Sequence, residues 1–329
     1  MTNEPSPPGR SGRRPRLTRR GRLVLVAGAV AVTAAAVLVP LLTAEPEKQH
    51  RPPPPLQQKL VIPEGWRATQ VYAAVDKALE APPGTTGKTA ATAKLKLPAD
   101  ARGNPEGYLF PATYPYDTTS TPAGLLSFMV NTSAQRFGSR RIADGVARNR
   151  LTLHQAVNIA SIVQAEADTA EDMGKVARVI HNRLAQGMPL QMDSTINYAL
   201  GRSTVDTTTA DTRLRSPYNT YENQGLPPSP IDNPGEEAMH AAVAPPPGDW
   251  LYFVTVEPGD TRFTSSYEEH QLHVAEFNAA RAKARATGAE TAGRMRGHTG
   301  AGSFSSSRVI SRTAARPARF APIVEAEGP

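Results

Sequence analysis

The chain contains no cysteine among its 329 residues. This absence excludes disulfide bonds, thiolate catalysis and cysteine-type zinc sites together. The sequence also lacks a Gly-x-Ser-x-Gly segment and a glycine-rich phosphate loop, so serine hydrolase and nucleotide chemistry have no motif. Aromatic residues make up only 6% of the chain, which holds 31 prolines and 25 glycines. We therefore expect the folded part to be markedly shorter than the chain.

The excess of basic charge lies in the two tails. Residues 56–280 hold 19 Lys and Arg and 24 Asp and Glu, a net charge of −5, whereas the flanks together carry +12. A nucleic-acid-binding domain instead gathers its basic residues on a folded surface. We therefore expect no nucleic-acid partner.

The N-terminal part has the pattern of a membrane anchor. Residues 1–22 contain seven arginines and one acid, and Leu23–Thr43 then runs without a charge, long enough for a helix across a bilayer. A cleaved signal peptide usually has an apolar stretch of only about 7–15 residues, which disfavours that alternative. The arginines predict that residues 1–22 stay in the cytoplasm. The expected location is the cytoplasmic membrane, with a single pass and the remaining chain outside.

A linker and a small membrane-proximal region are expected next. Residues 44–58 include Pro52–Pro55, which is typical of a stiff, extended spacer. Within residues 59–104, the pattern predicts a strand at Lys59–Ile62 and an amphipathic helix at Ala68–Leu79. This region is barely large enough for a core of its own.

Residues 105–280 are expected to form the main folded domain. The predicted helices are Leu125–Phe137, Leu153–Ala167 and Asp172–Gln186, the last with a capping start at Thr169, and the predicted strands are Trp250–Val256 and Arg262–Ser265. The fold class is therefore α+β. Residues 281–329 are rich in Ala, Gly, Ser, Thr and Arg, and we expect this tail to be disordered.

Glu166 stands out among the acids by its helical spacing. It follows Val163, Ile162 and Ile159 by three, four and seven residues, at the end of an apolar stripe. Asp168 falls on the polar side of the same helix. A carboxyl group against apolar surface loses solvation when charged, which raises its pKa and suits a general acid. Solvated acids at helix ends are more common, so spacing alone leaves both interpretations open.

Two further segments, both predicted to be loops, combine amides, hydroxyls and tyrosines. They are Leu190–Tyr198 and Ser216–Tyr221, the second followed by Gly225–Pro228. Sugars are bound by this combination, because amides and carboxylates form hydrogen bonds while aromatic faces cover the apolar side of the ring. Polar turn structure is the alternative interpretation.

Six segments match, in order, the motifs of one known family. They are Pro105–Tyr114, Ala160–Glu166, His181–Leu184, Gly187–Thr195, Tyr218–Tyr221 with Gly225–Pro228, and Leu251–Val254 with His270. In these segments, which are spread over residues 105–278 and so over roughly half the chain, the sequence resembles the YceG-like family of endolytic murein transglycosylases. The resemblance implies a YceG-like catalytic domain at residues 105–280.

The resemblance assigns the catalytic carboxyl group to Glu166. In the family this residue is the second acid of an Ala-Ser-Ile-Val-Glu-x-Glu pattern, and here Gln164 stands where many relatives have the first Glu. Relatives also carry a longer membrane-proximal part with a LysM-like module. Only its end, Leu60–Val75, is matched, so residues 59–104 are interpreted as a reduced, LysM-like remnant.

The activity implied by the resemblance is cleavage of the MurNAc–GlcNAc β-1,4 bond of peptidoglycan strands, leaving a 1,6-anhydro-MurNAc end. Such a lyase would terminate or trim nascent strands, and its expected partners include cell-wall synthesis proteins. It requires no cofactor and no metal. The residues expected to bind the substrate are Gln191, Asp193, Tyr218, Asn219, Tyr221 and Asn182.

Two alternatives stay open at this point. A muramidase with two carboxyl groups would use Asp193 as the partner of Glu166 and would leave a reducing muramic end. A membrane-anchored scaffold for cell-wall synthesis would have no catalytic activity, and it would not depend on Glu166.

Overall fold

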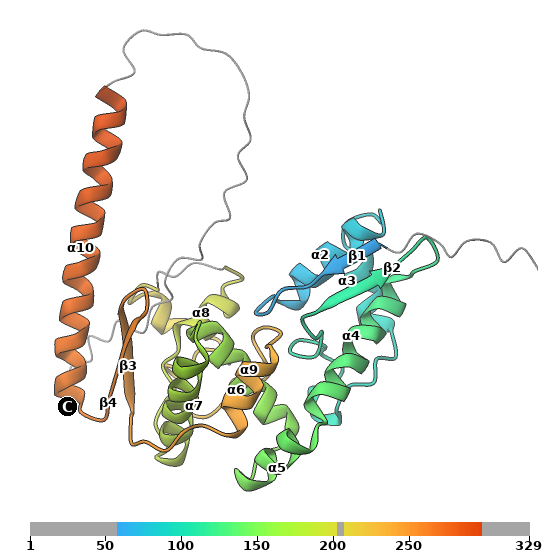
Figure 1. The fold of residues 1–329 in the computed structure, drawn as a ribbon, viewed down its shortest axis with the longest axis horizontal. Helices are drawn as coiled ribbons and strands as arrows, with labels where there is room; N and C mark the ends of the chain where they lie inside the picture. Colours follow the sequence, from blue (N-terminus) through green and yellow to red (C-terminus); the bar gives the residue numbers. More distant parts are fainter. Residues whose placement is uncertain (1–57, 203–206, 298–329) are drawn as a thin grey trace, which may run out of the picture. The chain divides into compact units, whose positions relative to one another are not determined.

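The computed structural model describes residues 58–202 and 207–297 (Figure 1). These residues belong to one unit of the chain that begins at Leu56. The predicted basic segment, the membrane helix, most of the linker and the end of the tail lie outside the described residues. Within the described ranges, no helix is both long enough and apolar enough to cross a membrane.

A two-stranded antiparallel sheet brings together two segments that are far apart in the sequence. Strand β1 (Gln58–Val61) pairs with β2 (Thr113–Tyr116), and Leu60 lies opposite Tyr114. Both side chains are buried. The structure thus confirms the strand predicted at Lys59–Ile62 to within one residue.

Two helices follow β1 and pack with the next one. Helices α2 (Ala68–Ala78) and α3 (Thr85–Thr92) contact α4 (Pro122–Phe137), which begins at a Thr121 cap with proline in its first turn. The amphipathic helix predicted at Ala68–Leu79 is confirmed. Strand β1 and helices α2 and α3 lie before residue 104, and they pack with β2 and α4, which lie after it. Elements on both sides of the expected domain boundary are therefore in contact.

Helix α6 (Leu153–Glu166) is the central helix of the remaining fold. Thr152 begins it with a capping box, in which Thr152 Oγ1 accepts from the Gln155 amide at 3.2 Å and Gln155 Oε1 accepts from the Thr152 amide at 2.8 Å. Every residue from Ala156 to Gln164 is buried, which places α6 inside the core rather than on its surface.

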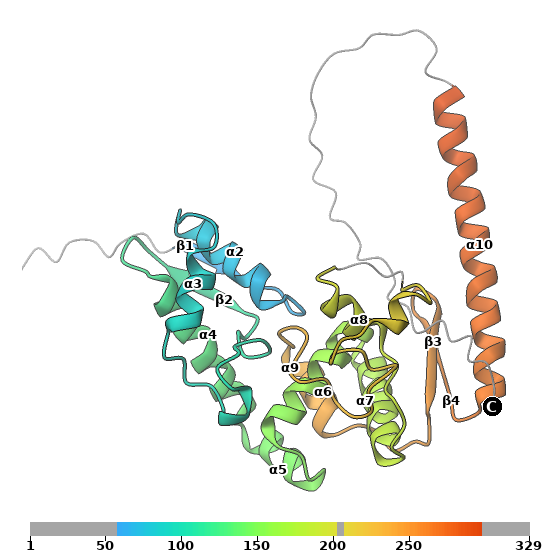
Figure 2. The same ribbon diagram turned by 180° about the vertical axis from the view of Figure 1, so that it is seen from behind.

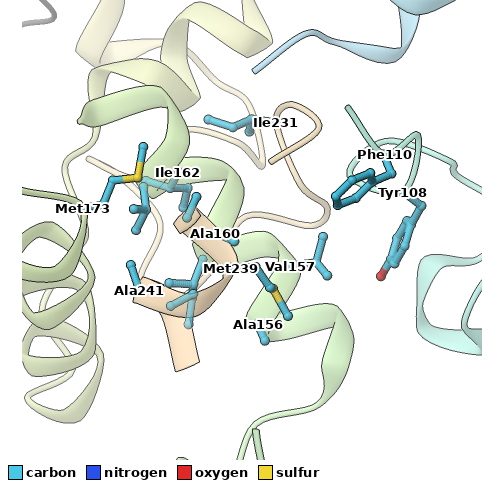
Figure 3. Packing of buried hydrophobic residues seen from close by; sticks show 14 of the residues in the cluster. Tyr108, Phe110, Ala156, Val157, Ala160, Ile162, Met173, Ile231, Met239 and Ala241 are labelled. Atoms are coloured by element: carbon cyan, nitrogen blue, oxygen red, sulfur yellow. The ribbon is translucent and has the colours of Figure 1, made fainter. Parts of the chain in front are cut away.

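Four further helices surround α6. They are α5 (Arg140–Arg148), α7 (Ala170–Ala185), α8 (Asp193–Ala199) and α9 (Glu236–Val243), and each contacts α6. Figure 3 shows Val157, Ala160 and Ile162 of α6 in this core with Met239 of α9. The predicted cap of α7 is confirmed, since Thr169 accepts from the Asp172 amide at 3.1 Å. Short 3-10 turns lie at Ala99–Ala101 and Asp211–Arg213.

A β-hairpin packs beside the last helix. Strands β3 (Tyr252–Glu257) and β4 (Asp260–Thr264) are antiparallel, and Gly259 takes the left-handed conformation that their turn requires. Both predicted strands are confirmed with shifts of one or two residues. Helix α10 (Tyr267–Gly297) contacts this hairpin, as both views of the ribbon show (Figures 1 and 2).

Helix α10 corrects one expectation. The tail was expected to be disordered from residue 281, whereas α10 continues to Gly297. Residues 281–297 contain no proline and are rich in Ala and Arg, which have high helix propensity. The expectation considered only apolar burial, and it therefore missed a helix that local propensity favours.

Candidate active site

Glu166 is the last residue of α6 and lies within the fold. Its side chain is only 6% exposed, whereas Asp168, two residues later, is exposed. The apolar stripe on the helix therefore correctly distinguished the buried Glu166 from the exposed Asp168. The backbone amide of Ser194 points at the Glu166 carboxyl group, with 3.3 Å between N and Oε1. Ser194 lies in the first turn of α8, so the end of one helix meets the start of another at this carboxyl group.

Asp193 supplies a second buried carboxyl group at the same place. It is the first residue of α8 and is 5% exposed. The hydroxyl group of Tyr221 donates to Asp193 Oδ1 at 2.6 Å. Burial raises the pKa of Asp193 to about 6, although the nearby hydroxyl groups of Tyr221 and Thr207 act in the opposite direction.

Tyr221 connects the two carboxyl groups electrostatically. Burial raises its pKa above the ordinary value, and the neighbouring charges of Asp193 and Glu166 raise it further. The hydroxyl group therefore keeps its proton and stays a hydrogen-bond donor over the whole physiological pH range. The structure thus brings together three of the residues selected from the sequence: Glu166, Asp193 and Tyr221.

Gln191 belongs to the same neighbourhood through Arg183. Arg183 Nη1 donates to Gln191 Oε1 at 3.1 Å and to the carbonyl groups of Pro189 and Leu190. Gln191 has a φ of 52°, in the left-handed region that a non-glycine residue adopts only when its surroundings hold it there. Arg183 thereby fixes the segment that leads into α8.

Arg183 was not selected from the sequence, although a signal was present. It follows Ile180 and Val176 by three and seven residues, so it is an arginine on the apolar stripe of α7. In the structure it is buried, its Nε donates to the carbonyl group of Leu251, and its guanidinium lies over the ring of Tyr252. A charged side chain in the core usually has a specific structural role. Arg183 binds backbone carbonyl groups next to the site.

Tyr218 and Asn219 lie in the loop that carries Tyr221. Asn219 is fully buried, and its amide donates to the carbonyl groups of Thr212 and Leu214 while its Oδ1 accepts from the Tyr221 amide. Asn219 therefore shapes the loop. Tyr218 is half-buried, and its hydroxyl group bonds to Ser229. Direct substrate contact by either residue stays a prediction.

Asn182 belongs to a different group of contacts. Its amide donates to the carbonyl groups of Gly248 and Trp250, at 3.2 and 2.9 Å, and so fixes the chain just before β3. The structure thus links Asn182 to the hairpin, whereas Gln191, Asp193 and Tyr221 are linked to the surroundings of Glu166. Its predicted role in substrate binding stays a prediction.

Gln164 stands at the position where many relatives were expected to carry glutamate. It is buried, and its Oε1 accepts from the backbone amide of Gly235 at 2.9 Å. Gly235 is the cap of α9, so this bond attaches α9 to α6. The contact requires only an acceptor oxygen, which an amide and a carboxylate both provide. That shared property accounts for a glutamine at this position.

The chain belongs to the YceG-like family, whose pattern matches residues 31–276. A segment of 169 residues is 37% identical to the endolytic murein transglycosylase of Bacillus subtilis, covering 50% of this chain and 46% of that protein. A segment of 182 residues is 36% identical to the Streptococcus pneumoniae protein of the same name, covering 54% of this chain and 33% of that protein. The chain thus spans less than half the length of these curated relatives.

A solved structure supports the same assignment. The crystal structure of a yceG-like protein from Listeria monocytogenes matches with a TM-score of 0.59 and 30% sequence identity, covering 65% of this chain and 75% of that one. The predicted family is therefore confirmed, and the mixed helices and strands agree with the predicted α+β class.

Proposed function

We propose that this protein is an endolytic lytic transglycosylase that cleaves peptidoglycan strands, with Glu166 as its catalytic acid and base. The observation that carries the proposal is the buried carboxyl group at the end of α6, next to the Ser194 amide and a second carboxyl group. Membership of the YceG-like family and two relatives named endolytic murein transglycosylase support it.

In the proposed mechanism, one carboxyl group performs both proton transfers. Protonated Glu166 donates its proton to the oxygen of the MurNAc–GlcNAc β-1,4 bond as that bond breaks. The carboxylate then takes the proton of the muramyl C6 hydroxyl group, whose oxygen attacks C1 and closes the 1,6-anhydro ring. Water is not consumed, and Glu166 ends in its starting protonation state. A buried carboxyl group suits this cycle, because loss of solvation disfavours its charged form.

Asp193 and Tyr221 would support the transition state in this proposal. An oxocarbenium-like sugar carries positive charge, which a nearby carboxylate stabilises. Tyr221 holds Asp193 Oδ1 through a 2.6 Å bond, so the carboxylate has a fixed direction. Gln191 is fixed by Arg183 in the segment before α8 and is proposed to position the strand.

The position of Asp193 favours one alternative reaction. A muramidase would use Glu166 as the acid and Asp193 as the base that activates water, and the product would have a reducing muramic end. A second alternative is a scaffold without catalytic activity. The chemical structure of the new ends distinguishes all three possibilities.

The test is an incubation of the full-length protein in detergent with uncrosslinked glycan strands, followed by mass spectrometry of the strand ends. Anhydro-muramic ends from the wild type, and intact strands from Glu166→Gln, would establish the transglycosylase. Reducing ends would support the muramidase instead. Asp168→Asn is the matched control, since Asp168 is an exposed acid two residues from Glu166 and should keep full activity.

We further propose that the chain is anchored in the cytoplasmic membrane by residues 23–43, with the folded unit outside. The uncharged stretch and the arginines before it support this topology. The proposal predicts that the full chain stays in the membrane pellet after alkaline carbonate extraction, and that a chain starting at residue 44 does not. Release of the full chain by carbonate would contradict it. Partner proteins of cell-wall synthesis would then be sought by crosslinking in cells.

A further inference from the structure

Glu106 is a buried carboxyl group outside the catalytic group described above. It is 4% exposed and lies in the segment between η1 (Ala99–Ala101) and β2. Its Oε1 accepts from the Ala68 amide at 2.8 Å and from Asn233 Nδ2 at 3.3 Å, and its Oε2 accepts from the Tyr198 hydroxyl group at 3.2 Å. Four segments of the chain therefore meet at one carboxyl group.

The bond to Tyr198 is the one that reaches the catalytic region. Tyr198 lies on α8, four residues after Ser194, so the two are one helical turn apart on the same side of the helix. Ser194 donates its backbone amide to Glu166. A short, continuous path thus runs from Glu106 through α8 to the catalytic carboxyl group.

Arg67 strengthens the hold on the same end of α8. Its guanidinium lies over the Tyr198 ring, 5.1 Å from the ring centroid, and its Nη2 donates to the carbonyl group of Arg202 at 2.8 Å. Arg67 is the N-cap of α2, immediately before Ala68. We call Arg67, Glu106 and Tyr198 the α8 clamp.

We propose that Glu106 is a positioning residue for catalysis, which holds α8 through Tyr198 so that the Ser194 amide meets Glu166. The proposal rests on the proposed transglycosylase function for its kinetic consequences. Its structural consequence, the order of α8, is independent of that function. The clamp also gives the membrane-proximal region, residues 59–104, a role in the site, because Arg67 and Ala68 belong to that region.

The backbone next to Glu106 supports a built site rather than a chance contact. Gly107 has a φ of 87°, and a side chain there would come within 2.6 Å of Pro230 and 2.9 Å of Val157. Glu106 is thus carried by a turn that only glycine permits in this close packing. The turn fixes the carboxyl group relative to α6, on which Val157 lies.

The charges around Glu106 come from three elements. The positive charge of Arg67, at the start of α2, favours the ionised form of Glu106. The negative charge of Asp232, in the segment before α9, in turn favours the protonated form of Arg67. Tyr72 of α2 lies near the same carboxyl group as a neutral phenol, and Tyr198 of α8 donates to it. Burial is the largest effect and raises the pKa of Glu106 to about 7. The carboxylate accepts three hydrogen bonds, and protonation removes part of this capacity.

The first test compares Glu106→Gln, which resembles the protonated form, with the wild type. At pH 8 we expect kcat to fall about 10- to 100-fold, the range that follows from slight misplacement of a catalytic group, with a much smaller change in KM. Because wild-type Glu106 becomes protonated below pH 7, the ratio of the two kcat values should shrink toward one as the pH falls to about 5.5. A ratio that stays constant over this pH range would overturn the proposal.

A double-mutant cycle tests the route through Tyr198. Since Glu106 acts through the Tyr198 hydroxyl group, Glu106→Gln combined with Tyr198→Phe should be no slower than the slower single variant. Independent, multiplying losses would contradict this route. Asp76→Asn is the matched control: Asp76 is also buried in the membrane-proximal part, but its hydrogen-bond partners Gly84 and Thr86 lie at the start of α3. It should change stability without changing kcat.

Hydrogen exchange separates this inference from the proposed function. In Glu106→Gln at pH 8, the amides of α8 should exchange faster, while those of α7 keep their wild-type protection. This readout needs no substrate. If the wild type made no anhydro ends, the proposed function would fail but the exchange result would still decide on the clamp. Unchanged exchange in α8 would overturn the clamp even in an active enzyme.

Discussion

Asp76 on α2 and Asp193 beside Glu166 are almost equally exposed, at 4% and 5%, yet their pKa values shift in opposite directions. Asp76 accepts from the Thr86 hydroxyl group and from the amides of Thr86 and Gly84, and these bonds lower its pKa. Burial dominates at Asp193 and raises its pKa to about 6. Equal exposure therefore does not produce equal chemistry, because few protein atoms surround Asp76 whereas Asp193 lies deep in the fold.

The difference lies in the donors around each group and in its depth below the protein surface. At Asp76, a hydroxyl group and backbone amides within ten residues along the chain stabilise the charge, so this aspartate stays ionised and ties α2 to α3. Asp193 relies on side chains from distant loops, and its charge is less well compensated. A structural carboxylate is thus distinguished from a candidate catalytic one by the bonds that stabilise its charged form.

The largest expected loss of activity is that of Glu166→Gln, which distinguishes Glu166 from Asp76 and Asp193. Glu166→Gln keeps the shape of the side chain but can neither donate nor accept the transferred proton, so kcat should fall about 10²–10⁴-fold. The measurement is the initial rate of anhydro-muramic end formation, with the melting temperature as the folding control. A variant that retains more than a tenth of the wild-type rate would remove Glu166 from the mechanism.

Asp193→Asn should have the next largest effect on activity. Loss of the negative charge beside the developing oxocarbenium ion should lower kcat about 10- to 100-fold above pH 6. The wild type should lose activity as Asp193 becomes protonated below pH 6, and this acid limb adds to the loss near pH 7 expected from Glu106. In Asp193→Asn only the loss near pH 7 should remain. The measurement is kcat between pH 4.5 and 8, and a second loss of kcat near pH 6 that survives in Asp193→Asn would belong to another group.

Tyr221→Phe provides the matched variant for this limb. The Tyr221 hydroxyl group donates to Asp193 and thereby lowers the pKa of that carboxyl group. Removal of the hydroxyl group should therefore raise the pKa of Asp193 and move the acid limb to higher pH. A limb that moves to lower pH would contradict the assignment of this hydrogen bond.

Some of this arrangement could be predicted from the sequence, because it depends on local periodicity. The stripe on α6 identified Glu166 as buried and Asp168 as exposed, and the capping signal at Thr169 placed the start of α7. Helix α8 was not predicted, since its seven residues are too few to show a period and include poor helix formers. Its position depends on contacts with distant segments.

The environment of Glu106 could not be predicted for the same reason. Its partners Ala68, Tyr198 and Asn233 lie 38, 92 and 127 residues away in the sequence. No spacing rule connects such positions. By contrast, Arg183 could have been found, because a charged residue on the apolar stripe of a helix is a visible exception to the local pattern. Substrate contacts by Gln191, Tyr218, Asn219 and Asn182 stay predictions.

The pH dependence of the free energy of unfolding should distinguish Asp76 from Asp193, because ionisation of the two groups has opposite effects on stability. The pKa of Asp193 is raised on folding from 3.8 to about 6, so its ionisation destabilises the fold progressively between these pH values. At pH 7, Asp193→Asn should therefore stabilise the protein by up to about 3 kcal/mol, since one pKa unit corresponds to about 1.4 kcal/mol. The pKa of Asp76 is lowered, so its stabilising effect is present at pH 7 and is lost in acid.

Melting temperatures of both variants between pH 3 and 8 check this prediction. Asp76→Asn should melt below the wild type at pH 7, and the difference should close as the pH falls below the ordinary aspartate range. Asp193→Asn should melt above the wild type at pH 7 and approach it in acid. Two variants that shift in the same direction at pH 7 would show that burial, rather than the donors, decides the behaviour of both groups.

The smallest effect is expected at Gln164, where the site can be compared with its relatives. Gln164→Glu keeps an acceptor for the Gly235 amide, so kcat should change less than about threefold. Gln164→Leu keeps a similar size but leaves that amide without its acceptor, which should lower the free energy of unfolding by about 1–3 kcal/mol. Rates and urea unfolding of the two variants provide the measurement. A tenfold gain in kcat from Gln164→Glu would instead show that a carboxylate at this position takes part in catalysis, because its contact with Gly235 would be unchanged.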